Sequence, residues 1–220
     1  MKFTPILSLF LCSNCSFTPS TSTEATLKNE GAKEILTLHQ QQRQEIGNYA
    51  MLMMQMVETK LSKTAQNVIA KSIVNVSMEI FSNQEERKQF VVLVGIESKF
   101  NPKAHSGAGA VGLTQVIPKY AKEFGAQCGM GDVTRDDLDN HDINLLVGAC
   151  RFKALLDSLN SNVALALVAY NAGQNSNQLK QLKSLSNITN VETSSYIAKY
   201  TFLRSKADNH EGGITNEAHK

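Results

Sequence analysis

The protein has 220 residues, of which 42% are hydrophobic, and its 22 Lys and Arg residues nearly balance 20 Asp and Glu residues, leaving a formal net charge of +2. This balance argues against a protein built around a nucleic-acid backbone, which normally carries a clustered basic patch, and the hydrophobic fraction is that of a folded globular chain. No apolar run approaches the roughly 20 residues that span a bilayer, which excludes an integral membrane protein with several spans.

Residues 1–16 follow the order of a secretory signal peptide. Lys2 precedes a short apolar stretch over 6–12, and small polar residues follow. A frayed apolar N-terminus and lipid attachment at Cys12 or Cys15 are the alternatives. The pair Cys12-x-x-Cys15 has redox or metal spacing, but it lies inside this segment and not beside a βαβ pattern, so we assign no site to it.

Cys128 and Cys150 remain once the signal peptide is set aside. An exported chain meets an oxidising compartment, where this even pair can form a disulfide typically worth ~2–4 kcal/mol. Two unrelated thiols are the alternative.

The segment after the signal peptide divides into a tether and a helical extension. Residues 17–29 are rich in Ser and Thr and contain Pro19, which predicts a flexible tether. Residues 30–82 contain no proline, and their apolar residues recur at three- to four-residue spacing, which predicts two or three helices. The methionine cluster in 51–56 is either core or an adaptable partner-binding surface.

Residues 83–205 predict a further helical domain, and 206–220 a flexible, solvated tail. No stretch alternates with period two for long enough to indicate a strand, so the expected fold class is mainly α. The helices are expected over 85–95, 116–124, 143–159, 163–170 and 191–205.

Glu97 is the first candidate for catalysis, because it ends the apolar run 90–96. A carboxyl at the end of a buried helix loses hydration, and desolvation favours its neutral form. An acid held protonated near neutral pH can donate a proton to a leaving oxygen. From this run alone, a partly exposed glutamate that only closes a helix is the alternative.

Residues 107–112 match the dinucleotide-binding pattern G-x-G-x-x-G. That site requires a strand before the glycines and a helix directly after them. Here a helix, Asn101-Pro102 and a polar turn come first, so the match fails. The glycines more plausibly allow close approach of the backbone to a ligand or another helix.

Several ordered motifs together resemble the soluble lytic transglycosylase (SLT) family, relatives of goose-type lysozyme. The resemblance covers about residues 85–205. The motifs are Gly95–Pro102 with Glu97-Ser98, Gly109–Pro118, Asp142–Asn144 followed by Gly148-Ala149, Ala169–Gly173 and Glu192–Ile197.

This resemblance implies an α-rich, lysozyme-like transglycosylase domain over 83–205, with a groove for the glycan strand of peptidoglycan. Glu97 matches the family's single catalytic acid. The resemblance also implies substrate-binding roles for Ser98 after the acid, Gln115 in the groove, Tyr170 and Asn171 beside the cleaved bond, and Tyr196 facing the catalytic carboxyl.

One residue departs from the family pattern. Thr114 stands where the family usually has methionine. The resemblance therefore implies a changed packing contact near a sugar subsite, and with it a changed subsite preference.

The implied reaction needs one carboxyl group. Glu97 would protonate the β-1,4 glycosidic oxygen between N-acetylmuramic acid and N-acetylglucosamine while the N-acetyl carbonyl stabilises the cationic centre. The Glu97 carboxylate would then take the proton of the C6 hydroxyl as a 1,6-anhydro ring closes, an exception to the two-carboxylate template of glycosidases. Such an enzyme would act outside the cytoplasm, in the periplasm or cell envelope, or with the virion if a phage encodes it.

Two alternatives stay open. A lysozyme-type hydrolase would cleave the same bond with water held by an aspartate of 132–142. A weakly active wall-binding component would serve a secretion, conjugation or phage-entry machine through residues 30–82.

We expect neither a required metal nor a cofactor. The aspartates of 132–142 lack EF-hand spacing and are expected to cap helices or line a solvated loop. The histidines offer no ligand pair at helical spacing. They are His39, His105, His141, His210 and His219.

Overall fold

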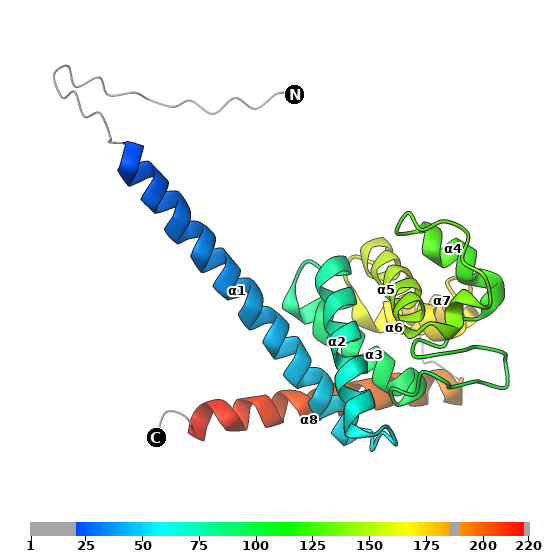
Figure 1. The fold of residues 1–220 in the computed structure, drawn as a ribbon. Coiled ribbons are helices and arrows are strands. Elements are labelled where there is room, and N and C mark those ends of the chain that lie inside the picture. The colour runs from blue at the N-terminus through cyan, green and yellow to red at the C-terminus, as the bar shows by residue number, and fades with distance from the viewer. Residues whose placement is uncertain (1–20, 185–189, 218–220) are drawn as a thin grey trace. The chain divides into compact units, whose positions relative to one another are not determined.

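The computed structural model describes residues 21–184 and 190–217, and over these residues it confirms the mainly α fold class. The expected signal peptide over 1–16, with Cys12 and Cys15, lies outside the described residues. The elements, drawn in Figure 1, are α1 (Thr21–Met56), α2 (Lys63–Ile80), α3 (Gln84–Ser98), the 3₁₀ helix η1 (Pro118–Tyr120), α4 (Ala121–Ala126), the 3₁₀ helix η2 (Asp137–Asp139), α5 (His141–Ser158), α6 (Val163–Ala172), α7 (Asn177–Lys183) and α8 (Val191–Glu217). Among them, no helix is both long and apolar enough to cross a membrane.

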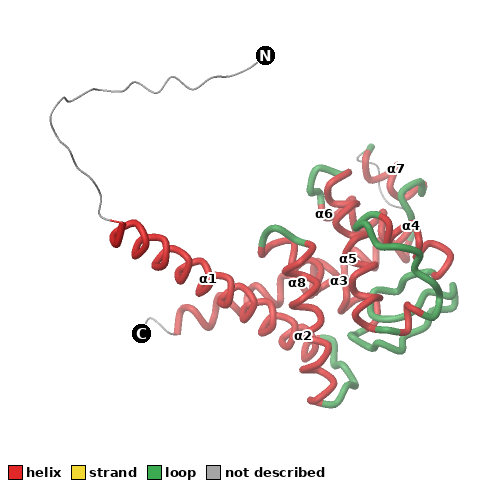
Figure 2. The backbone as a smooth tube through the Cα atoms, turned by 45° about the horizontal axis from the view of Figure 1, so that its top comes forward, coloured by secondary structure: helices red, strands yellow, loops and turns green. Residues whose placement is uncertain are grey.

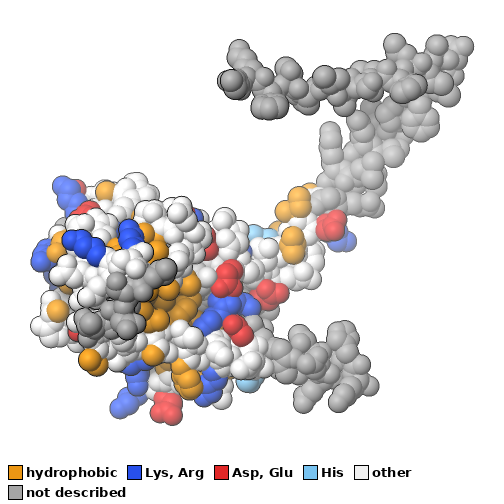
Figure 3. Space-filling model, turned by 180° about the vertical axis from the view of Figure 1, so that it is seen from behind, with side chains coloured by type: hydrophobic (Ala, Val, Ile, Leu, Met, Phe, Trp, Pro, Cys, Tyr) orange, Lys and Arg blue, Asp and Glu red, His pale blue; other side chains and the backbone are white. Residues whose placement is uncertain are grey.

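The chain divides into two compact units, residues 1–40 and 41–220. In the first unit, residues 21–40 are helical, so the expected tether over 17–29 is wrong from Thr21 onward. Pro19 is the last proline before Pro102, so no proline from Thr21 onward interrupts this helix. Three apolar side chains of this unit are exposed, namely Ile35, Leu36 and Leu38. Figure 3 shows hydrophobic side chains on the surface of this unit.

The second unit is built from packed helix pairs around one large core. Helix α2 lies against α5, α3 against α8, and α6 against both α5 and α8, as Figures 1 and 2 show together. The core residues of α1 recur at three- to four-residue spacing and are fully or almost fully buried. They are Ile46, Tyr49, Ala50, Met53 and Met54.

This core corrects the expected boundary between 82 and 83. Residues 41–82 share one core with α3, α5, α6 and α8, so they are part of the same compact unit and not an extension of it. The methionine cluster is mostly core, because Met53 and Met54 are fully buried while Met51 and Met56 pack partly buried against them.

Side-chain caps fix the ends of the helices that carry the site. The Asn83 side chain accepts a hydrogen bond from the Glu86 backbone N–H and begins α3, and Lys99 ends that helix in the left-handed conformation. The Asn190 side chain accepts from the Thr193 N–H at the start of α8. These caps place Glu97 in the last turn of α3 and Tyr196 in the second turn of α8.

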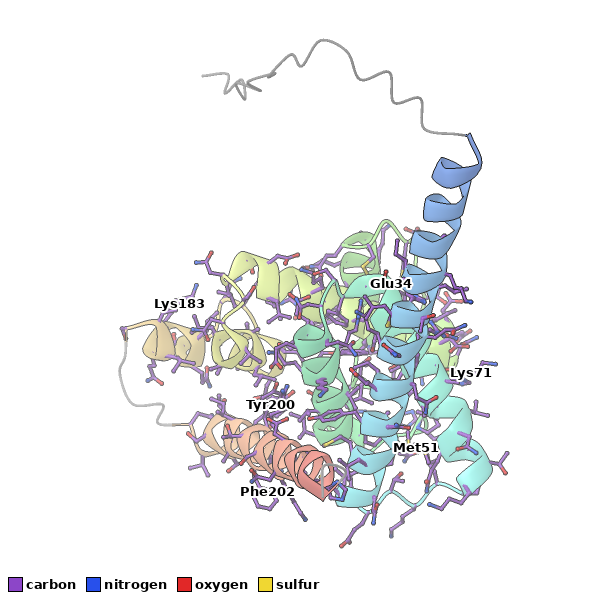
Figure 4. All side chains as sticks on the ribbon, turned by 90° about the vertical axis from the view of Figure 1, so that its left-hand side faces the viewer. Glu34, Met51, Lys71, Lys183, Tyr200 and Phe202 are labelled. Carbon is purple, nitrogen blue, oxygen red and sulfur yellow. A yellow bond between two sulfur atoms is a disulfide. The ribbon has the colours of Figure 1, made fainter. Side chains whose placement is uncertain are left out.

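Helix α8 continues to Glu217, through the first part of the segment expected to be a tail over 206–220. Ala207 is fully buried, and Arg204 pairs with Asp208 one turn later, so both packing and charge favour further helix. Figure 4 shows Tyr200 on the inner side of α8 and Phe202 on its outer side, in agreement with exposed fractions of 6% and 65%.

The segment after α3 differs most from expectation. In place of a helix over 116–124, Val116 forms an antiparallel bridge with Val111, and helical structure begins only at Pro118. The two valines exchange backbone hydrogen bonds of 3.0 and 3.1 Å. The glycine-rich stretch is thus a tight loop without the strand that a dinucleotide site requires.

Candidate active site

Glu97 lies in the last turn of α3, partly exposed at the end of the buried run 90–94. The Tyr196 hydroxyl donates a hydrogen bond of 2.5 Å to its Oε1 atom. The structure therefore brings together two predicted site residues that are 99 positions apart in the sequence.

Burial raises the pKa of the Glu97 carboxyl from 4.5 to about 7, and the hydrogen bond from Tyr196 lowers it by a smaller amount. A carboxylate in this position loses water, and one phenol replaces only part of that hydration. Near neutral pH the group therefore exchanges readily between acid and carboxylate, which suits a residue that gives and then receives a proton.

Two phenols that feel the charge of this carboxyl remain neutral. Burial raises the pKa of Tyr196 and of Tyr170 well above the usual value of 10, and the charge of Glu97 raises both further. The phenols therefore serve as hydrogen-bond donors over the whole physiological pH range.

Tyr170 connects the site to the glycine-rich loop. Its hydroxyl donates a hydrogen bond of 2.8 Å to the Thr114 carbonyl oxygen, which joins α6 to the residue before Gln115. Gln115 is half-buried, and its Nε2 donates to the carbonyl oxygens of Gly112 at 2.9 Å and Ala104 at 3.3 Å. Its φ of 50° is in the left-handed region, so the loop holds this side chain in a specific, uncommon backbone conformation.

Comparison of this sequence with models of known protein families identifies the family to which the protein belongs. The model of the transglycosylase SLT domain matches residues 75–191, which is more than half of the chain. The protein belongs to the transglycosylase SLT family.

The fold is also similar to a solved structure from this family. An X-ray structure of an inactive mutant of lytic transglycosylase Slt from Pseudomonas aeruginosa matches with a TM-score of 0.52 and 24% sequence identity, over 62% of this chain. The match spans 24% of the Slt chain, so the matched part of this protein corresponds to about a quarter of that enzyme's length.

Thr114, the residue that departs from the family pattern, lies in the interior of the SLT domain. Its side chain is fully buried, and its Oγ1 lies 2.8 Å from both the backbone oxygen and the Oδ1 of Asn144. The threonine therefore joins the loop to α5 in the interior, and the change at a sugar subsite that the resemblance implied stays a prediction.

Asn144 belongs to one of the sequence motifs, but the sequence did not indicate what its side chain does. It is fully buried, its Oδ1 accepts the Thr114 N–H, and its Nδ2 donates to the carbonyl oxygens of Val111 and Leu138. The loop comes so close that a Cβ on Gly112 would lie 2.1 Å from the Asn144 Nδ2. The signal in the sequence that could have identified Asn144 was its position in the Asp142–Asn144 motif.

The other two predicted site residues, Ser98 and Asn171, directly follow Glu97 and Tyr170 in the sequence but differ in exposure. Ser98 is 9% exposed, and its Oγ donates to the Val94 carbonyl oxygen of its own helix. Asn171 is exposed at the end of α6, directly after Tyr170. Asn171 is thus open to a ligand, whereas Ser98 supports the last turn of α3.

The predicted disulfide between Cys128 and Cys150 is present, with the two Cα atoms 5.6 Å apart. It joins the end of α4 to the middle of α5. Three of the five aspartates between them have partners close by in sequence: Asp132 pairs with Lys122, Asp137 accepts from Thr134, and Asp139 pairs with Arg135. In the part of the chain that the structure describes, no group of three or more His, Cys, Asp or Glu side chains is arranged to hold a metal ion.

Proposed function

We propose that this SLT-family protein is a peptidoglycan lytic transglycosylase in which Glu97 acts first as acid and then as base. One observation carries the proposal: the carboxyl of Glu97 is desolvated, hydrogen-bonded by Tyr196, and has a pKa of about 7. A single group with this pKa can perform both proton transfers near neutral pH.

The two steps balance without water. Protonated Glu97 gives its proton to the oxygen that joins N-acetylmuramic acid to N-acetylglucosamine, and the C1–O bond of the muramic acid breaks. The N-acetyl carbonyl oxygen of that sugar stabilises the positive charge at C1. The Glu97 carboxylate then takes the proton of the C6 hydroxyl as its oxygen bonds C1, which leaves a 1,6-anhydro ring and restores the acid.

Tyr196 and Tyr170 support these steps as neutral donors. The Tyr196 hydroxyl holds Glu97 Oε1, stabilises the carboxylate that forms after the first transfer and fixes its orientation for the second. Tyr170 fixes the loop at Thr114, which keeps Gln115 beside the same end of the site.

We assign substrate contacts to Gln115, Asn171 and the two tyrosines, and a positioning role to Ser98. Asn171 is exposed and Gln115 is half-buried, so both side chains can reach a glycan strand. Ser98 is bonded to its own helix and acts on substrate only through Glu97.

The placement of the aspartates favours the lyase over the lysozyme-type hydrolase. A hydrolase needs a second carboxylate to activate water. Three of the candidates, Asp132, Asp137 and Asp139, instead have charged or hydroxyl partners within residues 122–139.

We further propose that the protein acts outside the cytoplasm, in the periplasm or cell envelope, where peptidoglycan lies. The disulfide between Cys128 and Cys150 supports an oxidising compartment.

Digestion of purified peptidoglycan with product analysis by mass spectrometry tests the reaction. We expect 1,6-anhydromuropeptides from the wild type and none from Glu97→Gln, which keeps the shape of the side chain and removes the proton. Glu79→Gln, at an exposed position of α2, is the matched control and should behave as the wild type. Reducing-end products would establish the hydrolase instead.

The alternative of a wall-binding assembly component rests on the first unit, where Ile35, Leu36 and Leu38 are exposed. Deletion of residues 30–82 would remove core residues such as Ile46 and Met53 and unfold the domain, so the deletion must end at residue 40. If the protein without residues 30–40 keeps its full activity but loses its localisation, the first unit binds a partner. Unchanged localisation would contradict this role.

A further inference from the structure

Helix α8 is tied to α3 at two points, one at each end of their contact. At one end, the Tyr196 hydroxyl reaches Glu97; at the other, Arg204 reaches Glu85. As the chain advances from Glu85 to Glu97 along α3, the partner residue moves back from Arg204 to Tyr196, so the two helices are antiparallel.

The pair formed by Arg204 and Glu85 is bidentate. Arg204 Nη1 donates to Glu85 Oε1 at 2.9 Å, and Nη2 donates to Oε2 at 2.7 Å. The Arg204 Nε donates to both carboxylate oxygens of Asp208, at 2.9 and 3.0 Å. Asp208 lies one turn along the same helix, so it holds the guanidinium in the orientation that Glu85 requires.

The protonation states agree with this geometry. Burial alone would raise the pKa of Glu85, but the hydrogen bonds from Arg204 and Gln89 lower it overall. Burial would lower the pKa of Arg204, and its bonds to Glu85 and Asp208 raise it instead. Both groups therefore stay charged wherever Glu97 titrates.

Apolar packing also holds α8 against α3, and the pair of Arg204 with Glu85 adds a directional polar contact to it. The inner face of α8 carries the buried residues Tyr200 and Ala207, and the Tyr200 side chain is hydrogen-bonded with Arg204. A displacement of α8 by one residue along its axis is about 1.5 Å, enough to lengthen a hydrogen bond of 2.5 Å beyond the bonding range. A bidentate guanidinium–carboxylate pair is directional and resists such a displacement.

We propose that Arg204 is a positioning residue: its pair with Glu85 holds α8 in the register along α3 that brings the Tyr196 hydroxyl to Glu97. The inference rests on the proposed function for its catalytic consequence. Arg204 lies beyond residues 75–191 that match the SLT domain, so the match does not include it.

Arg204→Lys is the primary test, because lysine keeps the charge and cannot make the bidentate pair. We expect kcat on peptidoglycan to fall about tenfold with KM little changed, since the loss is one of orientation at the acid and not of glycan binding. Glu85→Gln should have the same effect through the other partner. Arg135→Lys, which alters a surface pair with Asp139, is the matched control and should leave kcat unchanged.

A measurement independent of activity separates this inference from the proposed function. The pKa of Glu97, followed by carbon NMR of its carboxyl group, should rise in Arg204→Lys, as it should in Tyr196→Phe, because both variants lose the hydrogen bond that lowers it. Tyr170 of α6 interacts electrostatically with the same carboxyl and is unchanged in both variants. An unchanged or lowered pKa in folded Arg204→Lys would overturn the proposal.

The double variant Tyr196→Phe with Arg204→Lys completes the test. If Arg204 acts through Tyr196, its substitution should cause no further loss of kcat once the hydroxyl is absent. A further tenfold loss would show that Arg204 acts by another route and would refute the positioning role. If the wild type releases no product but its Glu97 pKa responds as described, the proposed function fails and the positioning role stands.

Discussion

Thr114 and Gly148 lie so close that a Cβ added to Gly148 would be 2.4 Å from both Cβ and Oγ1 of Thr114. Gly148 is buried in the middle of α5, where glycine normally weakens a helix. The close approach explains the glycine: the loop that carries Gln115 packs against α5 only because this position has no side chain.

We expect Gly148→Ala to destabilise the fold by roughly 3 kcal/mol, because the new methyl group overpacks a fully buried contact. Chemical denaturation measures the change. Thr114→Ala should not rescue it, because the Cβ of Thr114 is itself one of the atoms in collision, whereas Thr114→Gly should restore part of the lost stability. Full stability of Gly148→Ala would show that the loop can move away from α5 at little cost.

Asn144→Asp tests the same contact between the loop and α5 by changing hydrogen-bonding groups while the side chain keeps its size. The substitution places a carboxylate oxygen where Nδ2 now donates to the Val111 and Leu138 carbonyls, so two acceptors face a third. We expect a loss of about 3 kcal/mol of stability together with reduced cleavage of peptidoglycan, because the loop holds Gln115. Asp142→Asn, an exposed change two residues earlier, is the control; a stable and active Asn144→Asp protein would contradict the role of this amide.

Most of the helices were predictable from the sequence because they follow from local patterns, whereas Glu97 was assigned as the acid from the family resemblance. The apolar run that ends in Glu97 left two interpretations open, a desolvated carboxyl and a partly exposed glutamate that only closes a helix, and the raised pKa of the group agrees with the first. The capping residue Asn83 and the proline-free stretch before it likewise indicate where helices form.

The pairings across the fold were less accessible, because they depend on packing between distant segments. The hydrogen bond of Tyr196 to Glu97 was expected only from the family resemblance. The pair of Glu85 with Arg204 was not expected at all, since a surface arginine on a helix usually faces solvent. The contact of Thr114 with Asn144 was not expected either, because it depends on how the loop packs against α5.

The disulfide is predicted to contribute to stability but not to the chemistry. Removal of Cys128–Cys150 with the double variant Cys128→Ser, Cys150→Ser should lower the free energy of unfolding by about 3 kcal/mol, because the bond closes a loop of moderate length. Cleavage of peptidoglycan at low temperature should persist, since Glu97 and Tyr196 lie on other helices. A fully inactive but folded double variant would show that the bond shapes the site directly.

Cleavage activity should decrease as the pH rises through about 7. The reaction begins with protonated Glu97, and the fraction of that form falls as the pH passes its pKa of about 7. The pH dependence of kcat/KM on soluble glycan strands measures this limb. In Tyr196→Phe the limb should move to higher pH, because the lost hydrogen bond lowers the pKa in the wild type; an unchanged limb would show that another group controls it.

The same carboxyl makes the stability of the fold depend on pH, with a definite sign. Glu97 binds its proton more tightly in the folded state than at its ordinary pKa of 4.5, so between pH 4.5 and about 7 the folded state holds more protons than the unfolded one. Stability therefore falls as the pH rises through this range, by at most about 3 kcal/mol. Glu97→Gln carries no charge and should escape this loss.

We therefore expect Glu97→Gln to match the wild type in stability at pH 4 and to exceed it at pH 8, as measured by urea denaturation at both values. Glu79→Gln, at an exposed position, should show the wild-type difference between the two pH values and so control for the general effect of removing a carboxylate. Equal pH dependence in Glu97→Gln and the wild type would mean that the Glu97 carboxyl is well hydrated, and the acid–base role would lose its physical basis. If Glu97→Gln is instead more stable than the wild type at pH 8, the buried Glu97 carboxylate destabilises the fold. The protein then gives up stability to hold the pKa of its acid near 7.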